Sequence, residues 1–341
     1  MSAAPKISVV MTVFNGGGFL AMAIESVLAQ TFEDFEFVIV DDASTDGSVE
    51  VVRRYATGDG RIRLICCKTN KGQTACLNQA MGEARGGWIA RQDADDVSLP
   101  ERQARQWSVV EESDDVVIVG TNGWMIDERG AVTGMIHVPL EGSEIRSSLP
   151  FRNPFIHTSV MFRRTLADGS LVRYDERFRI CQDWDLWVRL LRSGRGVNLA
   201  DPLVAYRHLD DSLSRGAREE TRRESAEIVA AAWKELFPAV PFNAELLREF
   251  REGAVCSDRR RFWRLHGRCV EGQARAVHRV QAAGALLPGD VRAGLVEIFA
   301  ATAAAPCWTV GALWKSLAIR LGLVPGFTSE VFDQKTGSLA G

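Results

Sequence analysis

Two pairs of aspartates follow apolar runs in the first hundred residues, where predicted strands end. Asp41 and Asp42 close one run, and Asp93 and Asp95 follow another. Clustered carboxylates repel one another and lose solvation, so a fold that gathers them usually supplies a cation. Oxygen ligands without a neighbouring His or Cys pair suit Mg²⁺ or Mn²⁺, whose open positions are commonly filled by substrate phosphates. The alternative for each pair alone is helix capping or a polar turn.

Predicted strands alternate with predicted helices in the part of the chain that must position these carboxylates. Short β-branched runs predict strands, and the segments between them have helical spacing. Such alternation indicates an α/β fold with a doubly wound, mostly parallel sheet. In such a sheet ligands bind beyond the carboxyl ends of the strands, so residues after the first strand join the aspartates. The expected strands are 7–14, 35–40, 62–66 and 88–90, and the expected helices are 19–30, 49–55 and 75–84.

The remaining chain has a different pattern. We expect three parts, at 1–105, at 106–215 with a strand at 116–120 and a helix at 183–191, and at 216–341 as a helical C-terminal region. An arginine-rich stretch at 258–279 is either a solvated helix face or a dock for anionic lipid. The uncharged stretch 298–314 is shorter than the ~20 residues of a membrane span, so we expect at most a peripheral membrane contact there.

Composition excludes some classes of protein. The chain has 341 residues, of which 46% are apolar and 25% charged, which excludes wholesale disorder. Its formal net charge of -3 argues against a nucleic-acid-coating protein. The cysteines have no paired metal spacing, and no secretion leader is evident, so we expect reduced thiols and a cytoplasmic location.

Seven segments of the sequence carry a family resemblance in their order and spacing. Over residues 6–214 the chain resembles the family 2 glycosyltransferases, whose nucleotide-sugar domain has the GT-A fold. The segments are ISVVMTVFNGGGFL, QTFEDFEFVIVDDASTDGS, NKGQTACLNQA, GGWIARQDADDVSLPERQ, NPFIHTSVMFRR, CQDWDLWVRLL and PLVAYRHLDDSLS.

The resemblance makes 1–105 the nucleotide-sugar-binding half and 106–215 the acceptor-binding half of a GT-A domain. It also implies a donor-binding role for residues at the strand ends. Thr12 and Phe14 would border the base, and Asp41 would receive hydrogen bonds from the base or ribose. Asp93 would face the ribose and the metal, and Asp95 would bind the divalent ion that bridges the diphosphate. The further donor-site residues are Asn15, Lys71 and Asn78.

The resemblance also implies a reaction. Asp183 matches the catalytic base that deprotonates the acceptor hydroxyl, and the transfer would be a single displacement with inversion. We expect a UDP-linked hexose or N-acetylhexosamine donor. Family habit suggests a saccharide or lipid-linked saccharide acceptor in polysaccharide biosynthesis, reached at the inner face of a membrane.

Other interpretations remain open from sequence. One is a nucleotide-sugar-binding module without catalysis. Another is an NAD-dependent dehydrogenase, because residues 16–21 fit G-x-G-x-x-G/A with Asp41 ~20 residues further on; it leaves Asp93 and Asp95 unexplained. Trp184 is expected either to pack in the core or to stack on a sugar ring, and His157 either to be structural or to contact the acceptor.

Overall fold

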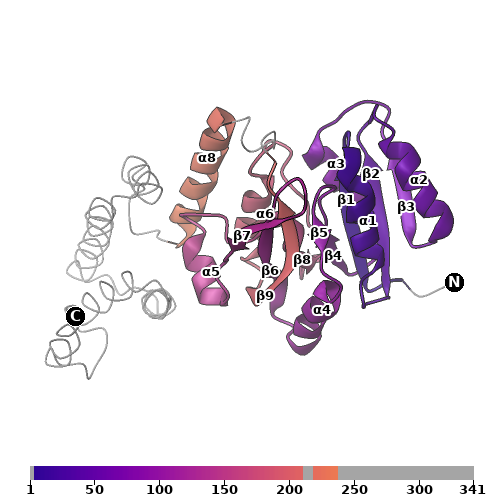
Figure 1. Cartoon of the computed structure of the whole chain (residues 1–341). Helices are drawn as coiled ribbons and strands as arrows, with labels where there is room; N and C mark the ends of the chain where they lie inside the picture. The colour runs from indigo at the N-terminus through magenta and orange to yellow at the C-terminus, as the bar shows by residue number, and fades with distance from the viewer. Residues whose placement is uncertain (1–3, 210–217, 237–341) are drawn as a thin grey trace, which may run out of the picture. The chain divides into compact units, whose positions relative to one another are not determined.

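Four parallel strands form the N-terminal side of the sheet in the computed structural model, which describes residues 4–209 and 218–236 (Figure 1). Three of them are buried along almost their whole length, because helices cover both faces of the sheet here. Their order is β3-β2-β1-β4. The bounds are β1 Ile7–Val13, β2 Phe35–Asp41, β3 Ile62–Cys66 and β4 Trp88–Arg91.

Helices connect these strands as the sequence predicts. The apolar face of α1 packs against the strands, and α3 lies against β1 and β2. Parallel neighbours require such crossovers, since a tight turn cannot return the chain to the same end of the sheet. The doubly wound α/β expectation is therefore confirmed for this half. The bounds are η1 Gly17–Phe19, α1 Leu20–Leu28, α2 Ser48–Gly58 and α3 Gln73–Glu83.

The second half continues the same sheet with mixed pairing. β8 pairs antiparallel with both β4 and β6, and β9 runs parallel to β6. The full order is β3-β2-β1-β4-β8-β6-β9-β5, with β7 paired to β6. Its elements are β5 Val97–Ser98, α4 Arg102–Glu112, β6 Val116–Ile126, β7 Val132–Ile136, α5 Gly142–Ser148, η2 His157–Ser159, β8 Met161–Arg163, α6 Gln182–Leu190 and β9 Arg195–Arg207.

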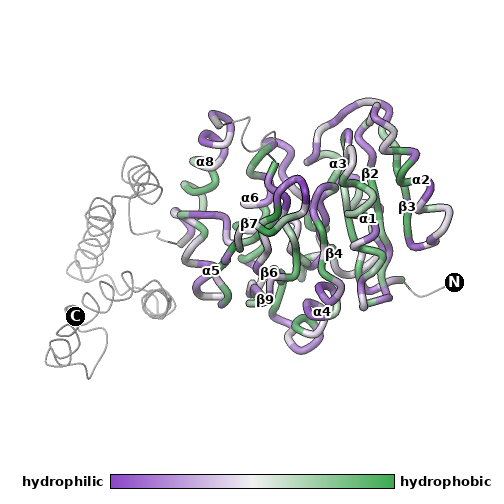
Figure 2. Tube along the Cα trace, in the orientation of Figure 1, coloured by the Kyte–Doolittle hydropathy of each residue, from purple (hydrophilic) through white to green (hydrophobic). Residues whose placement is uncertain are grey.

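A last described helix, α8 (Arg218–Leu236), packs on α6 and lies beside α5 (Figure 1). It belongs to the same compact unit as the sheet, which ends at Leu236. Figure 2 shows apolar residues along the central strands and, in α8, polar first turns followed by an apolar stretch. The stretches 258–279 and 298–314 lie outside the described residues, among which no helix is long and apolar enough to cross a membrane.

Candidate active site

The carboxyl ends of β1, β2 and β4 lie at one edge of the sheet. Val13 of β1 is in register with Asp41, and the N–H of Gln92 donates to the carbonyl of Val10. Asp41 and Asp93 therefore stand two strands apart, about 10 Å at ~4.8 Å per strand. Asp41 is buried; its Oδ2 accepts the Ser44 N–H at 3.0 Å, whereas its buried Oδ1 has no protein partner. A buried carboxylate oxygen without a partner is costly, so a ligand that donated a hydrogen bond to it would be stabilised.

The loop after β1 is tied to the loop after β2 by short polar contacts. The Asn15 side-chain oxygen accepts the Thr45 N–H at 2.9 Å, and the Gly17 N–H donates to Asp46 at 3.0 Å. Asn15 has a positive φ of 50°. Its side chain thus holds the loop, while the neighbouring Phe14 ring is 54% exposed. Thr12 is partly exposed just before it.

Asp42 organises the loop that carries Lys71. One carboxylate oxygen accepts the Lys71 N–H at 2.7 Å and the other accepts the Gly72 N–H at 2.8 Å. The Asp42 carboxylate and the thiols of Cys67 and Cys76 also lie within 4.8 Å of one another, close enough for metal ligands. Burial, and then a hydrogen bond to Asp42, raise the pKa of the Cys76 thiol well above its usual value, so it stays protonated. We interpret this group as a hydrogen-bonded support for the loop.

The loop that carries Asp93 and Asp95 begins with a buried arginine. Arg91 is fully buried, and its guanidinium pairs with the Asp93 carboxylate at 2.5 Å. The Asp93 N–H donates to the Thr158 hydroxyl at 3.1 Å. Burial and then the charge of Asp93 raise the pKa of Asp95 to about 6. Crowded oxygen donors of this kind fit a hard divalent cation, which would relieve the repulsion between the two carboxylates.

Two further buried arginines hold the backbone of this loop. Arg102 donates to the carbonyl of Arg91 at 2.7 Å and to that of Thr158 at 2.8 Å. Arg207 donates to the carbonyl of Asp95 at 2.9 Å. Sequence reasoning missed all three arginines. For Arg91 a signal existed, because a charged residue at the end of a buried strand needs a partner.

Asp183 is the second residue of α6. Its Oδ2 accepts the Asn153 side-chain N–H at 2.7 Å, and its Oδ1 accepts the Trp184 N–H at 2.7 Å. Burial raises the pKa of Asp183 to about 6, although both hydrogen bonds oppose the shift, and the charge of Asp93 adds to it. A carboxyl group with such a pKa is ionised at neutral pH and can still accept a proton.

Asp183 shares its surroundings with the loop after β4. Burial, and then the charges of three loop carboxylates and of Asp183, raise the pKa of Tyr206 to about 12. Charges interact this way only over short range. Hydrogen bonds connect Asp183 to this loop as well, because the Asp93 N–H donates to Thr158 and Asn153, five residues earlier in the chain, donates to Asp183; Asp41 lies at the end of β2, two strands from β4. The three loop carboxylates are Asp93, Asp95 and Asp96.

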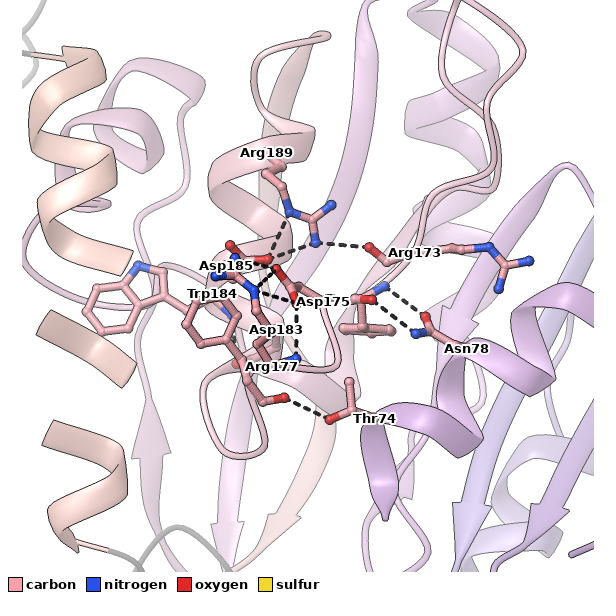
Figure 3. Close-up of polar contacts among 11 residues, drawn as sticks. Thr74, Asn78, Arg173, Asp175, Arg177, Asp183, Trp184, Asp185 and Arg189 are labelled. Atoms are coloured by element: carbon pink, nitrogen blue, oxygen red, sulfur yellow. Dashed lines mark hydrogen bonds and ion pairs between the residues drawn. The ribbon is translucent and has the colours of Figure 1, made fainter. Parts of the chain in front are cut away.

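Asn78 joins the two halves of the molecule instead of facing the sheet edge (Figure 3). Its side-chain oxygen accepts the Tyr174 N–H at 2.9 Å. Its amide nitrogen donates to the Tyr174 carbonyl and to Glu176, both at 3.0 Å. Both ends of the amide are thus engaged by protein, and Thr74 adds a bond to the Phe178 carbonyl at 3.0 Å.

The sequence left two roles open for Trp184 and His157, packing or contact with a sugar, and in the structure both side chains are packed against protein. Trp184 is only 7% exposed, and its indole N–H donates to the Leu149 carbonyl at 3.1 Å, so its ring is not free to stack on a sugar. The His157 Nε2 lies 2.9 Å from the Tyr174 hydroxyl, and its ring packs edge-on against Trp187. Burial lowers the pKa of His157 to about 3, which keeps the ring neutral.

Comparison with known proteins decides the family. Residues 8–168 match the model of glycosyl transferase family 2. The putative glycosyltransferase EpsE of Bacillus subtilis is 38% identical over 223 residues, which are 63% of this chain and 77% of EpsE. The chain belongs to glycosyltransferase family 2. The O-antigen biosynthesis glycosyltransferase WbnJ of Escherichia coli is 31% identical over 215 residues, which are 62% of this chain and 83% of WbnJ.

The fold of this chain is similar to that of a solved glycosyltransferase structure. Residues 1–349 of TarS from S. aureus, in complex with UDP-GlcNAc, align with a TM-score of 0.52 and 17% identity. The alignment covers 95% of this chain and 94% of that one. The expected GT-A fold is therefore confirmed.

Proposed function

We propose that this glycosyltransferase moves a sugar from a UDP-linked donor to a saccharide hydroxyl, with inversion and with the help of a divalent metal. The observation that carries the proposal is that one segment, 153–158, contacts both parts of the site: Asn153 donates to Asp183, and Thr158 accepts from the backbone of Asp93. A proton acceptor and a pair of oxygen ligands within one region are what a metal-assisted single displacement requires.

The donor would lie along the sheet edge from β2 to β4. The exposed ring of Phe14 would stack on the base, beside Thr12, and the unpaired Oδ1 of Asp41 would accept a hydrogen bond from base or ribose. The ~10 Å between Asp41 and Asp93 suits a ribose and diphosphate. Exposed Lys71 would provide positive charge nearby. UDP-GlcNAc in the TarS complex supports a UDP-linked donor.

Asp95, with Asp93 beside it, would hold Mn²⁺ or Mg²⁺. Asp93 is paired with Arg91, whereas Asp95 is partly buried beside the charge of Asp93, so a bound cation would supply positive charge to Asp95. The bound ion would supply positive charge to the departing diphosphate. The buried arginines fix the backbone of the loop, which orients both carboxylates.

Asp183 would act as the general base. The acceptor oxygen attacks the anomeric carbon from the face opposite the diphosphate, the sugar–phosphate bond breaks, and the hydroxyl proton passes to the Asp183 carboxylate. No covalent sugar–enzyme intermediate is required. The hydrogen bond from Asn153 keeps the carboxylate oriented.

The acceptor would be a saccharide or a lipid-linked saccharide. Relatives named for O-antigen and succinoglycan biosynthesis support a polysaccharide pathway. The boundaries 1–105, 106–215 and 216–341, and a cytoplasmic location with a peripheral contact at the inner face of a membrane, stay predictions.

The test is release of nucleoside diphosphate from a panel of UDP- and GDP-sugars, with a saccharide acceptor panel, Mn²⁺ and matched samples containing EDTA. We expect release from a UDP-sugar that EDTA abolishes. Tight metal-dependent UDP binding without turnover on any donor and acceptor would favour the binding-module alternative. Binding of NAD that is insensitive to EDTA would favour the dehydrogenase. Turnover unaffected by EDTA would remove the metal from the proposal.

A further inference from the structure

One buried carboxylate outside the site binds the backbone just before Asp183. Glu224 of α8 is 2% exposed. Its Oε1 accepts the Arg179 N–H at 2.8 Å, and its Oε2 accepts the N–H groups of Ile180 at 3.0 Å and Cys181 at 2.8 Å. A single side chain thus satisfies three consecutive backbone donors at the start of α6.

The position of Glu224 on α8 is unusual for a carboxylate. The buried stripe of this helix is otherwise mostly apolar, with Ile228, Ala232 and Trp233 on the same face. Burying a charge in such a stripe is costly unless hydrogen bonds replace its lost hydration. Three N–H groups at a helix N-terminus, where negative charge is favoured, provide that replacement.

The segment that Glu224 binds is also held from the opposite side. We call residues 178–183 the base turn. From α3, Thr74 donates to the Phe178 carbonyl at 3.0 Å, and the Gln73 side-chain oxygen accepts a hydrogen bond from Gln182 at 3.1 Å. Figure 3 shows the Thr74 contact and α6 with Asp183. Asp183 lies two positions after Cys181 in the chain, so a shift of the turn would move the base.

We propose that Glu224 is a positioning residue that fixes the base turn and so aims the Asp183 carboxylate at the acceptor hydroxyl. The inference rests on the proposed role of Asp183 as base. It makes α8, which lies beyond the family match at residues 8–168, part of the catalytic unit. The catalytic unit would then extend to Leu236, where the compact unit of the structure ends.

The experiment compares Glu224→Gln and Glu224→Asp with Glu227→Gln in the full-length protein. Glu227 lies one turn further along α8, is exposed and pairs with Arg177 at 3.5 Å, so it provides a matched loss of charge. The measurements are kcat and donor KM for the UDP-sugar that the wild type turns over, UDP affinity with Mn²⁺, and hydrogen–deuterium exchange of the base turn.

We expect Glu224→Gln to speed exchange in the base turn and lower kcat by roughly 10- to 100-fold, since small misplacements of a reacting group have such effects. Donor KM and UDP affinity should stay within about twofold, because the donor edge lies on other elements. Glu224→Asp should restore part of kcat, and Glu227→Gln should behave as wild type.

Two results would overturn the inference. One is unchanged kcat despite faster exchange in the base turn, which would make Glu224 purely structural. The other is an equal loss of kcat and UDP affinity, which would indicate general unfolding. Failure of the proposed function is distinguishable, because it is read on wild type and Asp183→Asn: if the latter keeps full kcat, Asp183 is not the base, whatever Glu224 does.

Discussion

The donor edge, formed by the loops after β1, β2 and β4, and the base turn are held in place by different kinds of contact. At the donor edge, Asp41 accepts from Ser44, three residues away, and Arg91 pairs with Asp93, two residues away. The base turn is held by Asn153, 30 residues from Asp183, and by Glu224, 43 residues from Cys181. Longer-range contacts also reach the donor edge, from Thr158 to Asp93 and from Arg207 to Asp95, so that edge is held partly by local contacts, whereas the base turn is held mainly by distant segments.

The sharpest test of this division is removal of the base itself. Asp183→Asn keeps the size and the Asn153 neighbour but cannot accept the proton, so we expect kcat to fall by about 10²–10⁴-fold. UDP affinity should stay within about twofold, since the donor edge is intact. Asp185→Asn, which changes a carboxylate two residues along α6 that pairs with Arg189, is the matched control. Transfer near the wild-type rate would end the base assignment.

Removing the predicted metal ligand should affect the other region. Asp95→Ala should raise the Mn²⁺ concentration for half-maximal donor binding by roughly 100-fold, equivalent to losing about 3 kcal/mol of metal binding. Exchange in the base turn should not change. Asp114→Asn, a substitution of an exposed aspartate, controls for loss of negative charge. An unchanged metal titration by calorimetry would exclude Asp95 as a ligand.

A smaller effect should appear in the pH profile. Asp183 must be ionised to act, and its pKa is about 6, so kcat should fall about tenfold per unit below that pH. Asn153→Ala removes a hydrogen bond that stabilises the charged form. Since such a bond contributes about 1.5 kcal/mol and one pKa unit is ~1.4 kcal/mol, the acidic limb should move up by about one unit.

The control for this profile is Arg152→Ala, which alters an exposed neighbour. The measurement is kcat at saturating donor between pH 5 and pH 9, so that donor affinity does not enter. An acidic limb that stays in place, or moves downward, would show that the Asn153 contact does not govern the ionisation of Asp183 during turnover.

The donor edge was predictable because strand ends follow from local pattern. The buried apolar runs before Asp41 and Asp93 predicted both strands. Because parallel strands have their carboxyl ends at one edge of the sheet, the two strand ends were expected to lie together. The position of Asp183 near them came from the family resemblance, since no local pattern links residues 183 and 93. β9 was not predicted, because its central Asp201-Pro202 interrupts any strand pattern.

The contacts that hold the base turn were not predictable, because each joins segments far apart in the chain. The same is true of Asn78, which contacts residues outside the base turn: it was expected to flank the donor, yet its amide is engaged by Tyr174 and Glu176. Glu224 offered one signal: its spacing with Ile228 and Ala232 places a carboxylate on an apolar helix face. Such a residue indicates a buried acceptor, but not which donors it meets.

The smallest expected effect on catalysis is at Asn78, which tests whether α3 belongs to the donor edge or only joins the two halves of the molecule. If it joins the halves, Asn78→Ala should lower the free energy of unfolding by about 1–3 kcal/mol, because the Tyr174 N–H is left unpaired. Donor KM and kcat should change less than about twofold. Asn78→Asp should cost more stability, since its negative charge would face Glu176 in place of a donated hydrogen bond. Chemical denaturation and steady-state kinetics measure both quantities. A raised donor KM with unchanged stability would instead return Asn78 to the donor edge, and the division between the two regions would no longer hold at α3.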